Sequence, residues 1–205
     1  MRGFRFFYYS DSHQFRSASF QWIYQYPRFR FRGYGQRFYG NHYYRGAVIL
    51  NKIIINFLDS EDELNAAFWK ALESNRLQTA PVSVDVPLIS NQDVWMNIAL
   101  IKQYHENMPR SQAQKLALHA LQRLDLAHIA YKRNPALTTE ERFCVYLLRA
   151  CMVQNAMIII DRPFKIIPQL RNSSFIFQTL KKVDDFYATC HIYDYKWMAD
   201  KYGDL

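Results

Sequence analysis

The sequence predicts an α/β fold with a parallel sheet at its core and a helical lobe attached to it. From residue 47 onward, short runs of branched apolar residues alternate with segments whose apolar residues recur every three or four positions. That alternation is typical of strands and helices that take turns along the chain. The apolar run Met157–Asp161 indicates a strand buried on both faces, as parallel strands are. Residues 91 to about 155 leave no room for a strand and are expected to form the lobe.

The first elements of this pattern are a hairpin, a helix and a short strand. The branched run Ala47–Ile55 is interrupted by Asn51 and Lys52, which predicts the hairpin. Ser60 and Glu63 have the spacing of a capping box, and helically spaced apolar residues follow them, so a helix is expected from Ser60. Pro81–Val86 is then expected to be the strand.

The predicted lobe contains three helices. The first extends from Asn91 to about His105, and the second begins at Ser111. A second capping box, Thr138 with Glu141, marks the beginning of the third.

The predicted sheet continues after the lobe, and its strand ends indicate where a ligand binds. The expected elements are a strand ending at Asp161, a helix, a second strand and a closing helical turn: 157–161, 173–182, 186–191 and 196 onward. Ligands of open α/β sheets bind at the carboxyl ends of parallel strands, so Asp161 and His191 are expected to share that edge. The alternatives are a turn-forming aspartate and a histidine satisfied in the core.

Composition divides the chain near Gly46. Residues 1–45 hold eight arginines, one acid and 17 of the 34 aromatic residues, so they carry +7 of the net charge of +8. We therefore predict an atypical Arg/aromatic-rich segment over residues 1–46 and a globular domain over residues 47–205.

The basic segment has three interpretations. It is an irregular extension, or it binds nucleic acid through arginines on phosphates and aromatic rings on bases. The third hypothesis is a frame error: a one-base shift of the codons for Gly33–Gly40 permits a glycine-rich run. The nucleotide sequence of codons 1–46 tests this hypothesis, because stop codons in the alternate frame exclude it.

Several classes of protein are disfavoured by the sequence. The apolar runs are far shorter than the roughly 20 residues of a spanning helix. Met1–Tyr9 has no aliphatic core of the kind that an export signal needs. Three cysteines without metal-site spacing indicate buried thiols in a reducing compartment instead of a disulfide framework or a zinc site.

Residues 84–205 resemble the second half of an ATP-binding-cassette (ABC) transporter ATPase. The resemblance lies in five segments in the family's order: 85–100 after the glutamine loop, 137–142 at the signature, 146–153 in the helix that follows, 158–163 at Walker B and 189–191 at the switch histidine. The resemblance implies a P-loop NTPase fold, ATP and Mg²⁺ as cofactors, and a membrane permease as partner. It also implies a second ATPase subunit as a dimer partner and a cytoplasmic place at the membrane periphery.

The resemblance also implies roles for individual residues. Asp161 stands where the family has its Mg²⁺ ligand, Arg162 where it has its catalytic glutamate, and His191 where it has its switch histidine. The remaining positions expected near nucleotide are Asp85, beside the glutamine-loop position, and the altered signature Thr138, Thr139 and Glu140.

Departures from the family pattern predict that catalysis is lost. The cation Arg162 cannot polarise the attacking water, and the signature glycines are replaced by Thr139 and Glu140. The chain contains no G-x-x-x-x-G-K-[ST] loop, whose amides and lysine bind the phosphates. We therefore expect no intact catalytic residue, little or no ATP binding, and a structural role beneath a permease. Alternatives are nucleic-acid binding by the basic segment and an α/β protein of other function.

Two further expectations follow from the resemblance. The permease is expected to contact residues 87–105, with Trp95 and Tyr104 as candidates that lobe packing explains equally well. A sheet without the P-loop strand is expected to lack a central member, which predicts marginal stability or association.

Overall fold

The computed structural model describes residues 47–203 except 51, 75 and 76. The Arg/aromatic-rich segment 1–46 lies outside the described residues, so its boundary and its proposed roles stay predictions.

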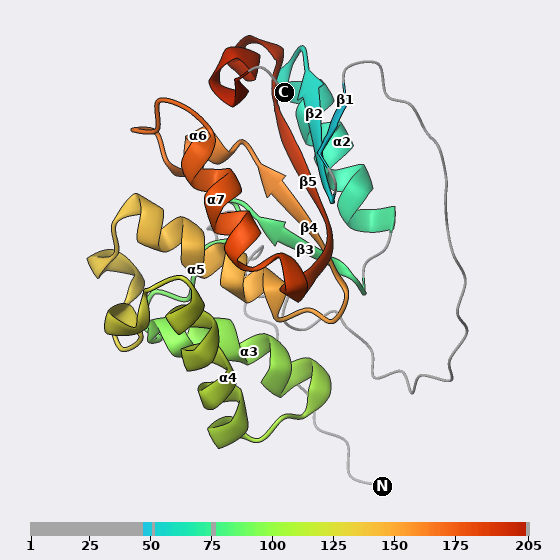
Figure 1. The fold of residues 1–205 in the computed structure, drawn as a ribbon. Helices are drawn as coiled ribbons and strands as arrows, with labels where there is room; N and C mark the ends of the chain where they lie inside the picture. The colour runs from blue at the N-terminus through green and yellow to red at the C-terminus, as the bar shows by residue number, and fades with distance from the viewer. Residues whose placement is uncertain (1–46, 51, 75–76, 204–205) are drawn as a thin grey trace, which may run out of the picture.

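A five-stranded sheet forms the centre of the described structure (Figure 1). Its order is β1–β2–β5–β4–β3. The strands are β1 (Ala47–Leu50), β2 (Ile53–Leu58), β3 (Thr79–Val82), β4 (Ala156–Asp161) and β5 (Tyr187–Tyr195). β1 and β2 form the predicted antiparallel hairpin, and β2 to β5 run parallel. The predicted α/β class with a parallel sheet core is therefore confirmed.

The expectation that the sheet lacks a central member is wrong. β5 is paired on both sides, with Ile53 of β2 opposite Cys190 and Ile158 of β4 opposite the same residue. The aliphatic run that begins at Ile53 supplies the strand, and α2 (Glu61–Ser74) follows it after a two-residue turn. The physical ground for predicting marginal stability is thereby removed.

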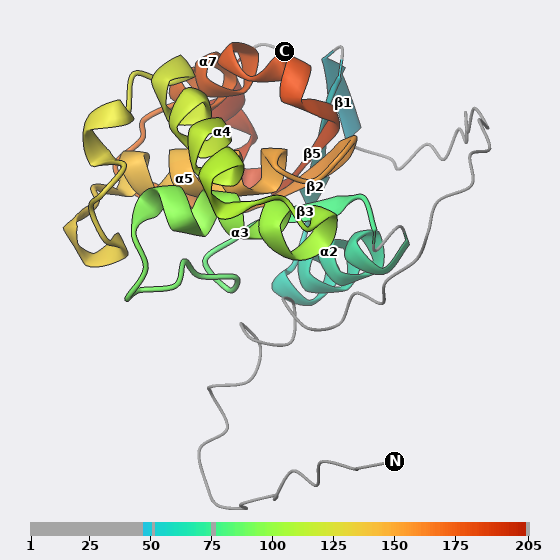
Figure 2. The ribbon, with the colours of Figure 1, turned by 90° about the horizontal axis from the view of Figure 1, so that it is seen from below.

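Helices cover both faces of the sheet (Figures 1 and 2). The connection from β2 to β3 uses α2, which packs on one face, where Ile159 and Tyr193 meet Leu64, Phe68 and Leu72. The connections from β3 to β4 and from β4 to β5 place their helices on the other face, where Ile158, Ile160 and Ile192 join the main core. Because neighbouring residues of a strand point to opposite faces, β4 and β5 are buried on both sides.

The segment predicted to be a lobe is helical, and part of it belongs to the sheet's own covering layer. It contains α3 (Val94–Glu106), α4 (Arg110–Arg123) and α5 (Thr139–Cys151), with short 3-10 turns at Ala127–Ile129 and Asn134–Ala136. Phe143 and Leu147 of α5, Ile98 of α3 and Leu121 of α4 belong to the same core as Ile158 of β4. The helices and the sheet therefore share one continuous core.

The two predicted capping boxes have different outcomes. At α5 the box is complete, because Thr138 Oγ1 accepts from the Glu141 N–H while the Glu141 carboxylate accepts from the Thr138 N–H. At α2 the Ser60 hydroxyl accepts from the Glu63 N–H, but the Glu63 carboxylate accepts from Asp59, one residue earlier.

After β4 the chain forms the short helix α6 (Pro163–Ile166), α7 (Ser174–Lys182) and a 3-10 turn at Asp184–Phe186. β5 and the 3-10 helix η4 (Lys196–Tyr202) follow, which confirms the predicted order of elements.

The cysteines and the helix lengths also bear on the expected class of protein. Cys144, Cys151 and Cys190 are free and buried, as predicted. Burial raises the pKa of Cys144 and of Cys151 to about 12, so these thiols stay protonated near neutral pH. No helix in the described part of the chain is long and apolar enough to cross a membrane.

Candidate functional site

Asp161 lies at the carboxyl end of β4, as predicted. It is only 1% exposed and is paired in register with Tyr193 of β5. Its Oδ2 atom accepts a hydrogen bond of 3.0 Å from the hydroxyl of Ser83, which directly follows β3. Three strand ends therefore meet around this carboxylate.

Arg162 turns back onto the carboxylate of its own neighbour. Its backbone is left-handed, with φ 44° and ψ 69°, and its N–H donates to the Tyr193 carbonyl at 2.8 Å. Its Nε donates to Asp161 Oδ1 at 2.7 Å and its Nη2 donates to Asp161 Oδ2 at 3.0 Å. A non-glycine residue in this region costs about 1–3 kcal/mol, and the bidentate ion pair offsets that cost.

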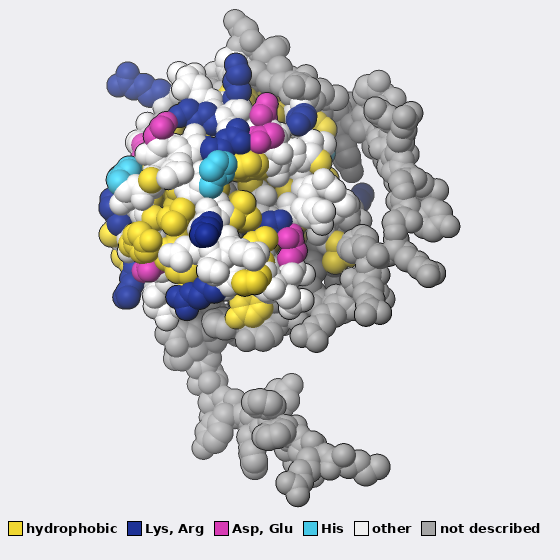
Figure 3. Space-filling model, turned by 60° about the horizontal axis from the view of Figure 1, so that its bottom comes forward, with side chains coloured by type: hydrophobic (Ala, Val, Ile, Leu, Met, Phe, Trp, Pro, Cys, Tyr) yellow, Lys and Arg dark blue, Asp and Glu magenta, His cyan; other side chains and the backbone are white. Residues whose placement is uncertain are grey.

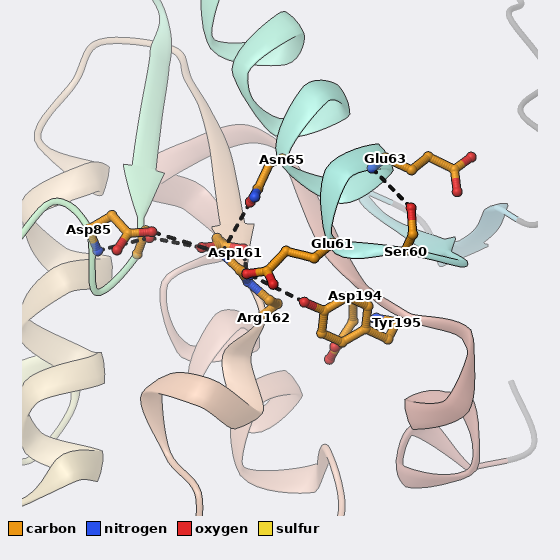
Figure 4. A network of polar contacts seen from close by, with 10 residues as sticks. Ser60, Glu61, Glu63, Asn65, Asp85, Asp161, Arg162, Asp194 and Tyr195 are labelled. Atoms are coloured by element: carbon orange, nitrogen blue, oxygen red, sulfur yellow. Dashed lines mark hydrogen bonds and ion pairs between the residues drawn. The ribbon is translucent and has the colours of Figure 1, made fainter.

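The outer side of the same guanidinium contacts three other parts of the chain (Figure 4). Nη1 donates to Glu61 Oε1 at 3.2 Å and to the Tyr195 hydroxyl at 3.3 Å. Nη2 donates to Asn65 Oδ1 at 3.4 Å and lies 3.8 Å from Asp85 Oδ2. α2, the loop after β3 and the end of β5 all contact one side chain.

The electrostatics of this cluster keep Arg162 charged. Burial lowers the pKa of the guanidinium, but hydrogen bonds to Asp161 and Tyr195 outweigh it and raise the pKa above its ordinary value. An arginine already stays protonated at any physiological pH. The positive charge beside Asp161 is therefore permanent.

His191 does not lie at the sheet edge, and that prediction is wrong. β5 continues to Tyr195, so His191 is inside the strand, paired with Ile54 and Ile159. Burial lowers the pKa of its imidazole, which favours the neutral form. His191 lies two register positions before the level of Asp161. The prediction was wrong because the apolar pattern alone underestimated the length of the strand.

The altered signature residues begin α5 and contact the loop between α6 and α7. Thr138 is the N-cap, and both the Thr139 hydroxyl and the Glu140 carboxylate accept from the Gln169 side-chain amide. The hydrogen bond from Gln169 lowers the pKa of Glu140, so its charge is favoured. These polar groups stabilise a helix start in this structure.

Sequence reasoning missed a second buried carboxylate next to the site, Asp194. It is 1% exposed, and its Oδ2 accepts from the Tyr202 hydroxyl at 2.7 Å. Burial raises the pKa of Asp194, and the hydrogen bond from Tyr202 partly opposes this. The tyrosines on both sides, Tyr193 and Tyr195, were the sequence signal that the strand extends beyond His191.

ATP and Mg²⁺, which the resemblance implies, do not fit the residues at this edge. The two oxygens of Asp161 already accept three hydrogen bonds. Two of these bonds come from the guanidinium of Arg162, a cation that would repel Mg²⁺. The first turn of α2 is acidic, with Glu61, Asp62 and Glu63, so it repels phosphate at the helix end where anions otherwise bind. Gly203 is the only glycine of the described residues, so they contain no glycine loop that could surround a phosphate.

Among known proteins, this chain is similar to several solved structures. No family model matches the chain, and no curated protein matches it. Matching solved structures include the dimeric structure of the bacterial ABC transporter cassette MJ0796, with 22% identity and a TM-score of 0.48 over 62% of this chain and 57% of that one. A post-hydrolysis state of the same cassette with ADP and Pi matches at 24% identity and a TM-score of 0.47, over 74% and 63%.

A third match is cbiO1 from Clostridium perfringens, part of the transporter complex cbiONQ, with 17% identity and a TM-score of 0.47 over 62% and 51%. All three come from ABC transporters. This is the family that the sequence resembles. The chain spans less than two thirds of the length of each of these structures.

Proposed function

We propose that this chain is an ABC-type cassette-like subunit that does not hydrolyse ATP and that acts as a structural partner of a membrane permease. Residues 47–205 form the cassette-like unit of this proposal, placed at the membrane periphery. The observation that carries the proposal is the bidentate pair between Arg162 and Asp161, because it uses the carboxylate that would hold the metal.

Hydrolysis needs several groups that the described residues do not offer. A phosphoryl-transfer site positions a water, neutralises the phosphate charge with Mg²⁺ and lysine, and uses backbone amides around the phosphates. In the present chain a cation stands beside Asp161, and acids occupy the first turn of α2. These features favour a protein whose role depends on its shape and surface.

A permease contact on α3 would fall on Tyr104. Trp95, the other candidate, is 4% exposed and packs in the core with the Arg110 guanidinium 5.4 Å from its ring centroid. Tyr104 is 57% exposed. Trp95 therefore supports the lobe, and Tyr104 is the residue of the pair that a partner can reach.

The alternative role, nucleic-acid binding, depends on residues outside the described part of the chain. On the face shown in Figure 3, the Lys and Arg side chains are scattered among hydrophobic and uncharged ones. The described residues on this face thus offer no continuous basic patch for a nucleic-acid backbone.

Calorimetric titration of the full chain with ATP, with and without Mg²⁺, tests the proposed function. We expect no saturable heat up to about 1 mM nucleotide. A dissociation constant above about 1 mM corresponds to a binding free energy of less than about 4 kcal/mol. A phosphate-release assay on the same protein should give no turnover. An ABC cassette with an intact P-loop serves as positive control, and saturable Mg²⁺-dependent binding or turnover by this chain would refute the proposal.

A further inference from the structure

We propose that the guanidinium of Arg162 occupies the position at the carboxyl edge of the sheet where a ligand would otherwise bind. In that position it holds the surrounding elements in one arrangement. The proposal deepens the proposed function, on which it rests only for the claim that no bound nucleotide is needed.

The first argument is the number of acceptors around one side chain. The guanidinium contacts six oxygen atoms on five residues: both carboxylate oxygens of Asp161, Glu61 Oε1, Asn65 Oδ1, Asp85 Oδ2 and the Tyr195 hydroxyl. Four separate parts of the chain supply them, namely α2, the loop after β3, β4 and β5. No two of these parts are adjacent in sequence, so the side chain cross-links elements that the backbone does not join here.

The second argument is the graded exposure of these partners. The Arg162 side chain is 7% exposed and that of Asp161 is 1% exposed, whereas Glu61 and Asp85 are 67% and 56% exposed. Exposed ion pairs contribute little, and a buried pair is costly to break from one side. The pair with Asp161 therefore anchors the guanidinium, and the hydrogen bonds to Asn65 and Tyr195 connect it to α2 and β5.

The third argument is the shape that the acceptors favour. Nε and Nη2 address the two oxygens of Asp161 in parallel, which only a planar guanidinium can do and an ammonium cannot. Among the described residues, no group of three or more His, Cys, Asp or Glu side chains is placed to hold a metal ion. Removing the Arg162 side chain should therefore leave a site for a small guanidinium compound.

Chemical rescue of the full chain tests this inference. We expect Arg162→Ala to lower the melting temperature by roughly 6 to 12 °C, because it leaves Asp161 buried without its partner. Methylguanidinium chloride at low millimolar concentration should then raise the melting temperature of this variant saturably and leave the wild type unchanged. MgCl₂ at the same ionic strength should rescue neither protein.

Matched variants separate the site from general effects. Arg171→Ala removes an exposed arginine and should melt close to the wild type without rescue. The double variant Arg162→Ala, Asp161→Asn should lose the rescue, because the bidentate acceptor is gone. If Arg162→Ala does not fold, Arg162→Lys takes its place in the test, because lysine keeps the charge but cannot form the bidentate pair. Arg162→Lys should fold and melt at a lower temperature than the wild type.

Two results would overturn the inference. The first is that Arg162→Ala melts at the same temperature as the wild type, or that Arg162→Lys does so where the alanine variant does not fold. The second is that Mg²⁺, and not methylguanidinium, raises the melting temperature of the variant. No nucleotide is present in these measurements. They can therefore fail while the wild type still does not bind ATP, and ATP binding by the wild type can refute the proposed function without affecting them.

Discussion

At the scale of single residues, two neighbouring carboxylates at the sheet edge are neutralised in different ways. Asp161 is paired with a permanent cation, whereas Asp194 is buried beside the hydroxyl of Tyr202. A buried charge without a cationic partner shifts its pKa toward the neutral form, which is the direction found for Asp194. Asp194 is therefore the member of this pair whose charge burial disfavours.

The raised pKa of Asp194 predicts how the stability of the protein depends on pH. Because its folded-state pKa is raised, its contribution to stability is fully present below the unfolded-state pKa and is lost as pH rises through the folded-state pKa. Asp194→Asn keeps an oxygen for the Tyr195 N–H and removes the charge. Melting curves at pH 4 and pH 7.5 should show the variant more stable, relative to wild type, at the higher pH.

Four groups act on the Asp194 carboxylate. They are the Tyr202 hydroxyl, the Tyr195 N–H, the charge of Asp161, which raises the pKa, and that of Lys201, which lowers it. Tyr202→Phe removes the strongest hydrogen bond and is expected to steepen the same pH dependence. A stability difference between Asp194→Asn and wild type that does not change with pH would contradict this account.

At the scale of secondary-structure elements, the helix starts show how local sequence and tertiary contacts combine. α5 begins with a reciprocal cap, and Gln169 adds two hydrogen bonds to its first turn from another part of the chain. α2 begins with half of such a cap, and another residue of its first turn, Glu61, accepts a hydrogen bond from Arg162. The acidic first turn of α2 therefore serves both the helix dipole and the site.

The caps predict different costs of substitution. Thr138→Ala should lower the free energy of unfolding by about 1 to 2 kcal/mol, whereas Thr138→Ser should stay close to wild type. Ser60→Ala should cost about 0.5 kcal/mol, since α2 keeps its other contacts. Urea denaturation of the three variants measures the order, and equal losses for Thr138→Ala and Ser60→Ala would refute the distinction.

At the scale of the whole molecule, one core joins the sheet and the helical segment. Ile98, Leu121, Leu147 and Ile158 come from α3, α4, α5 and β4, and each is fully buried in the same cluster. A core that continues across elements resists the independent unfolding of any one of them.

This continuity predicts a single cooperative unit over residues 94–195. Amide hydrogen exchange in increasing urea should bring the most protected amides of α3, α4, β4 and β5 to one common free energy of opening. Early exchange of α3 and α4 at a free energy about 2 kcal/mol lower would show that they unfold as a separate lobe. The full chain is used, and exposed loop amides provide the internal reference.

Much of the fold could be predicted from the sequence because it depends on local pattern. The order of strands and helices, the hairpin at Ala47–Ile55, the cap at Thr138 and the place of Asp161 at a strand end all follow from the spacing of neighbouring residues. The buried thiols follow from composition in the same way.

Only the tertiary structure decided how β2 completes the sheet, where His191 lies and how the site is closed. β2 pairs with β5 across more than 130 positions of sequence, and that pairing extends β5 to Tyr195. The sequence placed Arg162 beside Asp161 and at odds with Mg²⁺, but its left-handed backbone and its contacts with Glu61, Asn65 and Asp85 arise from segments about 77 to 101 positions away. Such contacts form only when packing brings distant segments together, and no local periodicity records them.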